Sequence, residues 1–126
     1  MEPLKIKSTE DTPKVLFDPL NDIFEISGRS LPEDVNQFYA PIKEWLSEYF
    51  QAPNPKTTFI FNLNYFNTAS SKILVELFSY MSELSESGTD MEVKWYCSED
   101  DEDIIDAGEE FAENVDFSFE IIVIPE

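Results

Sequence analysis

The spacing of apolar residues switches repeatedly between a period of two and a period of three to four along this chain. Apolar and polar side chains alternate over 57–66, then recur every third or fourth residue over about 68–86. Alternation returns over 91–97, a second helical pattern runs from near 98 or 100 to 112, and alternation closes the chain over 117–124. A period of two predicts a strand and a period near 3.6 predicts a helix. Strands that alternate with helices predict an α/β fold built on a largely parallel sheet.

The first half of the sequence adds a hairpin and a helix. Two short apolar runs, 15–17 and 23–26, flank the turn-forming residues of 18–22, which predicts two antiparallel strands. Gly28 is expected to end the second of these strands. The sequence Ser-Leu-Pro-Glu at 30–33 has the form of a capping box and predicts a helix start, with an apolar stripe that continues to about Tyr49. Pro41 lies inside that stripe, so we expect a kink there or a break into two short helices.

The predicted order is therefore strand, strand, helix, strand, helix, strand, helix, strand (ββαβαβαβ), in a mixed, largely parallel sheet opened by a hairpin. We interpret residues 1–126 as a single domain in which about 1–12 form a loosely held lead-in. Several strands carry polar residues on their second face, which favours helices mainly on one face of the sheet. These polar residues are Glu25, Asn62, Asn64, Glu92 and Lys94.

Charge and missing residue types exclude many functions. The chain has 27 acidic and eight basic residues and a formal net charge of −19, which argues against nucleic acid and anionic membranes as partners. It contains no histidine and one cysteine, so one chain holds no His-based triad, no His-containing zinc site and no disulfide. Its three glycines do not form a phosphate-binding fingerprint, and we expect no cofactor. No signal peptide or membrane-length apolar stretch is visible, so a cytoplasmic location and no membrane insertion are expected.

The most acidic run, 98–103, allows two interpretations. Asp100, Asp101 and Asp103 would form a cation site or a catalytic carboxylate pair, although the alternation of ligands in a calcium loop is absent. The simpler interpretation is that Ser98 or Asp100 caps the third helix and the other carboxylates favour its positive end. Saturable calcium or magnesium binding would support the first interpretation.

Cys97 and the tryptophans have plain structural explanations. Cys97 ends an alternating segment on its apolar side, and no basic residue nearby would lower its pKa, so we interpret it as a small buried side chain. Trp45 and Trp95 lie on the apolar stripes of their elements, which favours the core over a ligand site.

The segment 65–72 joins a probable central strand directly to a helix. The carboxyl ends of parallel strands are where such sheets receive ligands and partners. Asn67 or Thr68 is the expected N-cap, and the hydroxyls of Ser70 and Ser71 follow, with Lys72 one turn after Thr68. Phosphorylation of Thr68 would add ~1.5–2 negative charges where a helix N-terminus stabilises an anion. A partner that buries a neutral threonine would then have to desolvate a dianion, which gives a switch without catalysis.

The chain resembles the SiaC family of bacterial regulatory phosphoproteins, which are similar in fold to STAS-type anti-sigma-factor antagonists. The resemblance covers most of the sequence through short motifs in a fixed order. These are Thr12-Pro13, Gly28-x-Ser30-x-Pro32-Glu33, Trp45, Asn67-Thr68-x-Ser70-x-Lys72, Val93-Lys94-Trp95 and Glu109-Glu110-Phe111.

The resemblance implies a non-enzymatic partner-switching protein. A serine/threonine kinase would phosphorylate Thr68, a PP2C-type phosphatase would remove the phosphate, and the unphosphorylated form would bind and activate a diguanylate cyclase. Asn67, Ser70, Ser71 and Lys72 are candidate contacts for the kinase or the partner. The alternatives are a constitutive adaptor that binds its partner irrespective of phosphorylation, and the acidic cation-binding module described above.

Overall fold

The computed structural model describes residues 1–86 and 88–125 and contains one mixed sheet of six strands with three α-helices. The elements are β1 (Leu4–Ile6), β2 (Lys14–Asp18), a 3₁₀ turn η1 (Pro19–Asn21), β3 (Ile23–Ser30), α1 (Val35–Tyr49), β4 (Lys56–Phe66), α2 (Thr68–Ser85), β5 (Asp90–Ser98), α3 (Glu102–Glu113) and β6 (Ser118–Ile124).

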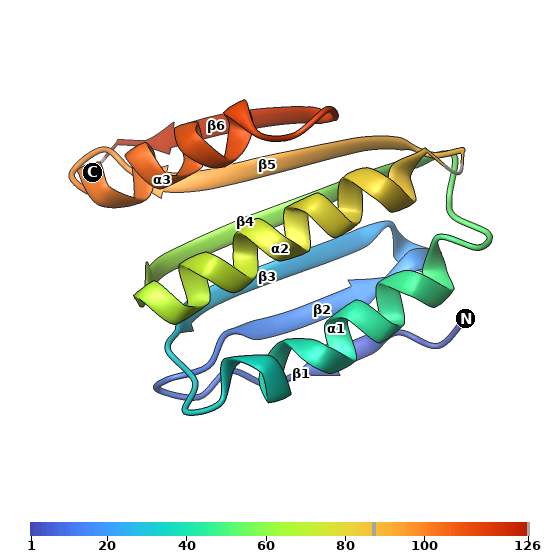
Figure 1. Ribbon diagram of the computed structural model, residues 1–126, viewed down its shortest axis with the longest axis horizontal. Coiled ribbons are helices and arrows are strands. Elements are labelled where there is room, and N and C mark those ends of the chain that lie inside the picture. The colour runs from blue at the N-terminus through green and yellow to red at the C-terminus, as the bar shows by residue number, and fades with distance from the viewer. Residues whose placement is uncertain (87, 126) are drawn as a thin grey trace.

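The strands lie side by side in chain order, from β1 to β6. The pairs β1–β2 and β2–β3 are antiparallel, whereas the pairs β3–β4, β4–β5 and β5–β6 are parallel. The three helices cover one face of the sheet, as Figure 1 shows. The α/β class, the opening hairpin, the parallel sheet and the one-sided helices are therefore confirmed.

The core lies between the helices and the covered face of the sheet, and it is unusually aromatic. Trp95 is fully buried and Trp45 is 8% exposed, so both tryptophans belong to the core as predicted. The Trp95 indole contacts the ring of Phe111 at 5.3 Å between centroids, and Phe78 lies 5.3 Å from the same ring. This cluster holds α2 and α3 onto β5.

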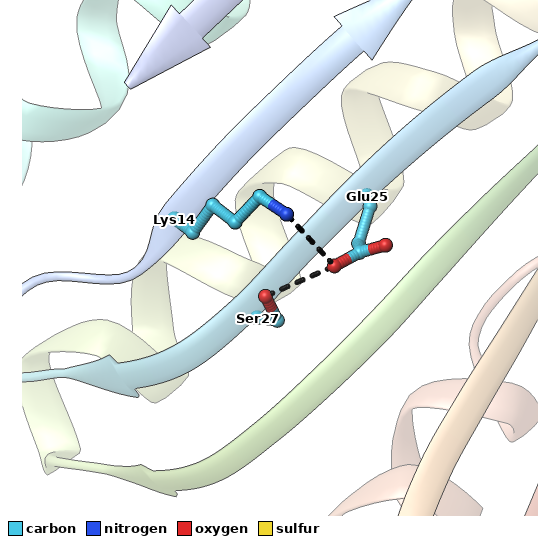
Figure 2. Close-up of polar contacts among 3 residues, drawn as sticks. All are labelled: Lys14, Glu25 and Ser27. Carbon is cyan, nitrogen blue, oxygen red and sulfur yellow. Dashed lines mark hydrogen bonds and ion pairs between the residues drawn. The ribbon is translucent and has the colours of Figure 1, made fainter. Parts of the chain in front are cut away.

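The open face of the sheet is polar, as its sequence alternation indicates. Figure 2 shows Lys14 of β2 and Ser27 of β3 converging on Glu25, on the side away from the helices. The Lys14 Nζ lies 3.8 Å from Glu25 Oε1, and Ser27 Oγ donates to the same oxygen at 3.1 Å. Lys56 pairs with Glu92 across β4 and β5 at 3.5 Å. Such half-exposed pairs contribute little stability.

The expectation of a loosely held lead-in at 1–12 is wrong for its central part. Leu4–Ile6 form the edge strand β1, which pairs antiparallel with β2. The Trp45 indole N–H also donates to the carbonyl of Glu2 at 3.0 Å. A three-residue strand is too short to show a period, so only pairing with β2 reveals it.

The predicted helix start at Ser30 is also wrong. β3 continues past Gly28 (φ 112°) through a bulge, and Ser30 is its last residue, fully buried. Helix α1 instead begins after Asp34, whose side chain accepts a hydrogen bond from the Gln37 N–H at 3.1 Å. The helix then runs to Tyr49 as one element with Pro41 inside it, so the expected break into two helices does not occur.

Over the residues that the structure describes, no helix is both long enough and apolar enough to cross a membrane.

Candidate functional site

The carboxyl ends of β3 and β4 meet at the start of α2. Ser30, the last residue of β3, is in register with Phe66, the last residue of β4. The next N–H, that of Asn67, donates to the carbonyl of Ser30 at 3.2 Å. Two parallel strands therefore fix the position at which α2 leaves the sheet, and Thr68 is its first residue.

Asn67 is the N-cap of α2. Its backbone is extended (φ −85°, ψ 177°), and its side-chain Oδ1 accepts a hydrogen bond from the Ser70 N–H at 2.8 Å. Its carbonyl accepts the first helical bond, from the Ser71 N–H at 2.9 Å. Of the two caps that the sequence allows, the structure selects Asn67, which leaves the Thr68 hydroxyl free of the capping role.

A buried chain of hydroxyls anchors this helix start from below. The Tyr39 hydroxyl of α1 and the Ser30 Oγ of β3 are 2.7 Å apart, and Ser30 Oγ donates to Ser70 Oγ at 2.9 Å. Because a serine hydroxyl has one proton, Tyr39 is the donor to Ser30. Burial raises the pKa of Tyr39, and the hydrogen bond with Ser30 opposes part of that rise. The network ties α1, β3 and α2 together.

Sequence reasoning misses this network. Ser30 and Ser70 are 40 residues apart, and Ser30 has a plausible alternative role in a capping box. The sequence does show that Ser30 and Ser70 both lie near the ends of predicted elements. This becomes informative only once the strand order is known.

The five residues predicted for the site differ in exposure. Thr68 and Lys72 are exposed, Asn67 and Ser71 are half-buried, and Ser70 is fully buried at 0%. Of Thr68, Ser70 and Ser71, Thr68 is thus the most exposed, and Ser70 is held in the network below the surface. The structure brings Thr68 and Lys72 onto one side of α2, because they lie one turn apart.

The electrostatics of the helix start favour an added anion. The first N–H groups of an α-helix have no carbonyl partners within the helix and carry the positive end of its dipole. Thr68 lies in this first turn, and α2 has no acidic residue there. A phosphate on the Thr68 hydroxyl would therefore be stabilised by the helix N-terminus and by the ammonium group of Lys72.

The acidic run has a structural role at the start of α3. Asp101 is the N-cap, and its Oδ1 accepts from the Ile104 N–H at 3.2 Å, so the predicted caps Ser98 and Asp100 are wrong. Asp103 lies in the first turn, where the helix dipole stabilises its charge. Within 1–86 and 88–125, no group of three or more acidic, cysteine or histidine side chains is arranged to hold a metal ion.

Cys97 borders a pocket of 490 Å³ at the carboxyl ends of β4 and β5, which Asn64 and Asp101 also line. The thiol is buried and lies 3.7 Å from the carbonyl of Ile122. Burial raises its pKa, and the carboxylates of Asp101 and Glu109 raise it further. Cys97 is thus the small buried side chain that the sequence predicts, and its raised pKa disfavours the reactive thiolate form.

The structure is that of a small α/β domain with a mixed sheet and its helices on one face. The sequence model of the SiaC family regulatory phosphoproteins matches residues 6–124. The chain therefore belongs to the SiaC family.

Individual relatives agree with this assignment. A curated protein of Pseudomonas aeruginosa (strain UCBPP-PA14) is 24% identical over 121 residues, which covers 96% of each chain. The crystal structure of apo-SiaC from Pseudomonas aeruginosa superposes with a TM-score of 0.87 at 23% identity, covering 97% of this chain and 99% of that one. The structure of the diguanylate cyclase SiaD in complex with its activator SiaC, from the same organism, contains a chain that matches with a TM-score of 0.87 and 23% identity. That match covers 96% of this chain and 99% of the other.

Proposed function

We propose that this chain is a non-enzymatic partner-switching protein whose binding to a diguanylate cyclase is controlled by phosphorylation of Thr68. The unphosphorylated form binds and activates the cyclase. A serine/threonine kinase adds the phosphate and releases the cyclase, and a PP2C-type phosphatase restores the binding form. Family membership and the complex of SiaD with its activator SiaC support the choice of partner.

The observation that carries this proposal is the contrast between Thr68 and the residues that surround it. Thr68 is exposed at the first position of α2, while the cap of Asn67 and the buried hydroxyl of Ser70 hold the backbone below it. A phosphate therefore changes the charge of the surface while the fold that presents it stays the same. A partner seated on this surface would lose its contact with a neutral side chain and face a dianion.

The neighbouring residues take different parts in the proposal. Lys72 and Ser71 are exposed or half-exposed on the same turn and contact the kinase or the partner directly. Asn67 and Ser70 act through the backbone, because the first caps the helix and the second is buried.

The test compares the protein before and after enzymatic phosphorylation. Intact-mass and phosphopeptide spectrometry on protein from its own host should place one phosphate on Thr68, removable by phosphatase treatment. Binding of the host's diguanylate cyclases to the two purified forms is then measured by calorimetry. We expect the unphosphorylated form and the isosteric Thr68→Val variant to bind, and the phosphorylated form to bind at least ~10-fold more weakly.

Thr58→Val serves as the matched control, because Thr58 lies on the open face of β4 and the same change there should leave phosphorylation intact. Equal binding by the phosphorylated and unphosphorylated forms would overturn the switch and identify a constitutive adaptor instead. Saturable calcium or magnesium heat that Asp101→Asn abolishes would favour the cation-binding module.

A further inference from the structure

The two edges of the sheet differ in how well they are protected against further strand pairing. β1, at the first edge, has three residues, of which the central one is the exposed Lys5. β6, at the other edge, has seven residues and contains neither lysine nor proline. Short edge strands and edge lysines keep a sheet from pairing with other chains. By this criterion β1 is protected, whereas β6 is open to a further strand.

The backbone of β6 presents unpaired groups along its outer side. The Ile124 carbonyl accepts from the Glu99 N–H at 3.0 Å, just past the end of β5. The Ile122 carbonyl lies 3.7 Å from the Cys97 thiol of β5, so both carbonyls point inward. The N–H and C=O groups of one residue point to the same side of a strand, and successive residues alternate. Within 1–86 and 88–125, no strand therefore pairs with the outward groups of three residues. These are Phe119, Ile121 and Val123.

Apolar side chains are exposed on both faces of this edge. Val123 and Ile124 each have 45% of their surface exposed. Val123 is in register with the buried Cys97, so it lies on the helical side of the sheet, and Ile124 lies on the open side. A strand added beside β6 would place its alternate side chains next to these two residues. Such a strand therefore gains apolar burial as well as backbone hydrogen bonds.

Helix α3 adds to this surface on the helical side. It packs on β5 and β6, and Glu110 faces α2, because both line one small pocket (Figure 1). Ile105, Glu109 and Ala112 follow one another at spacings of four and three, on a side of α3 that points away from Glu110. That side faces the outer edge of β6. Ile105 and Ala112 are half-buried there and Glu109 is exposed, which gives an apolar overhang with an acidic rim.

The charge around this edge is strongly negative. Residues 99–125 contain eleven acidic side chains and no lysine or arginine. Glu120 is exposed on the open side of β6, and the one basic residue of β5, Lys94, is in register with it. Two copies of a chain with a net charge of −19 would repel each other if they paired here. A strand that carries lysines or arginines would instead be attracted.

We propose that β6 receives an extended segment of a partner protein as an additional strand of the sheet. The segment alternates apolar residues, which lie beside Val123 and under Ile105, with lysines or arginines, which lie on the open face beside Glu120. Its backbone pairs with the outward groups of β6. In this mode of recognition the main-chain hydrogen bonds give affinity and the alternate side chains give selectivity. The inference goes beyond the proposed function and does not depend on phosphorylation.

The probe is a short synthetic peptide of alternating valine and lysine residues. Its control is the same peptide N-methylated at every residue, which keeps the charge and the side chains but has no backbone donor. Calorimetry should show binding of the first peptide and at least ~10-fold weaker binding of the second. Hydrogen exchange followed by nuclear magnetic resonance should be fast at the outward N–H groups of Phe119, Ile121 and Val123. These groups should become protected when the first peptide is added.

A pair of variants places the site on the molecule. Val123→Lys puts a positive charge on the β6 edge and should weaken binding of the valine–lysine peptide at least ~10-fold. Val75→Lys makes the same change on α2 at nearly equal exposure, 47% against 45%, and should stay within ~2-fold of the original protein. Circular dichroism verifies that both variants are folded.

Three results would overturn the proposal. Equal binding of the two peptides, or an equal loss of binding in the two variants, would show attraction to the net charge alone. A lack of protection at the three outward N–H groups would do the same, and this measurement needs no variant. If the protein alone sediments as a dimer that Val123→Lys dissociates, the edge is instead covered by a second copy of the chain.

Discussion

At the scale of single residues, Gly108 packs so closely against Trp95 that no larger side chain fits there without a shift. A Cβ at this point of α3 would lie 2.5 Å from Cδ1 and 2.6 Å from Nε1 of Trp95. The Trp95 ring is fully buried, and its N–H donates to the carbonyl of Ile104 at 3.0 Å, so it has no room to withdraw. The glycine therefore lets α3 approach the tryptophan edge closely enough for that hydrogen bond.

Replacing Gly108 with alanine should destabilise the protein although alanine is the better helix former. We expect the overpacking to cost about 1–3 kcal/mol of unfolding free energy, which outweighs a gain of up to ~1 kcal/mol in helix propensity. Urea unfolding followed by tryptophan fluorescence measures the difference. Glu109→Ala, at the exposed neighbouring position, should change stability by less than about 0.5 kcal/mol. An equally stable Gly108→Ala protein would show that Trp95 can shift.

Tyr39 should make the protein sensitive to alkaline pH. Its folded-state pKa is raised above the ordinary value of 10.0, so the native protein holds this proton more tightly than the unfolded chain. The stabilisation from Tyr39 is therefore complete below that value and is lost as the pH rises through the folded-state pKa. Urea unfolding across a pH series should show a shallower alkaline loss for Tyr39→Phe than for the original protein. The lysines and the other tyrosines titrate in both proteins. If the unfolding free energy fell equally with pH in both, the loss would therefore not come from Tyr39, and its raised pKa would be contradicted.

At the scale of elements, the start of α2 depends on one side chain. Asn67→Ala removes the acceptor for the Ser70 N–H and should cost ~1 kcal/mol of stability. Asn67→Asp keeps the acceptor and adds a charge that the helix dipole favours, so it should retain the original stability. Chemical unfolding of the three proteins tests this. An Asn67→Asp protein as unstable as Asn67→Ala would mean that the amide group itself is required.

The elements also show where a sequence is informative. The long alternating and helical patterns predict β4, α2 and β5 to within one or two residues, because each buries one side of a regular structure along its whole length. β1 is missed because three residues show no period. The Ser30 capping motif is misread because burial beside Tyr39 outweighs a local preference.

In the candidate site, too, some residues can be predicted from local sequence and others only from the folded structure. Asn67 and Thr68 follow from their place at a strand-to-helix junction, which local sequence defines. The burial of Ser70 and its bond to Ser30 depend on which strand lies next to β4, so only the folded structure reveals them.

At the scale of the whole molecule, repulsion among 27 acidic residues should limit stability at low ionic strength. The ion pairs found within 1–86 and 88–125 are Lys14–Glu25, Lys43–Glu76 and Lys56–Glu92, all partly exposed and each worth ~0–1 kcal/mol. Added salt should therefore weaken the repulsion among the acidic residues more than it weakens the attraction within the ion pairs. We expect the melting temperature to rise with sodium chloride and to level off toward ~1 M, where the screening length is about 3 Å.

Low concentrations of guanidinium chloride and urea provide the control for this salt effect. The first is a salt and should raise the melting temperature before its denaturing action prevails, whereas urea should lower it throughout. A melting temperature that falls on addition of sodium chloride would show that the ion pairs outweigh the net charge.

The order of the strands has a consequence for how the chain is assembled. Every strand from β2 onward pairs with the strand that precedes it in the sequence. No strand therefore has to insert between two strands that are already paired. Folding can therefore follow translation, each helix closing over the sheet as its strand arrives. β6 lies at one edge of the sheet and pairs with β5 alone, so we expect that local opening of β6 leaves the other five strands paired.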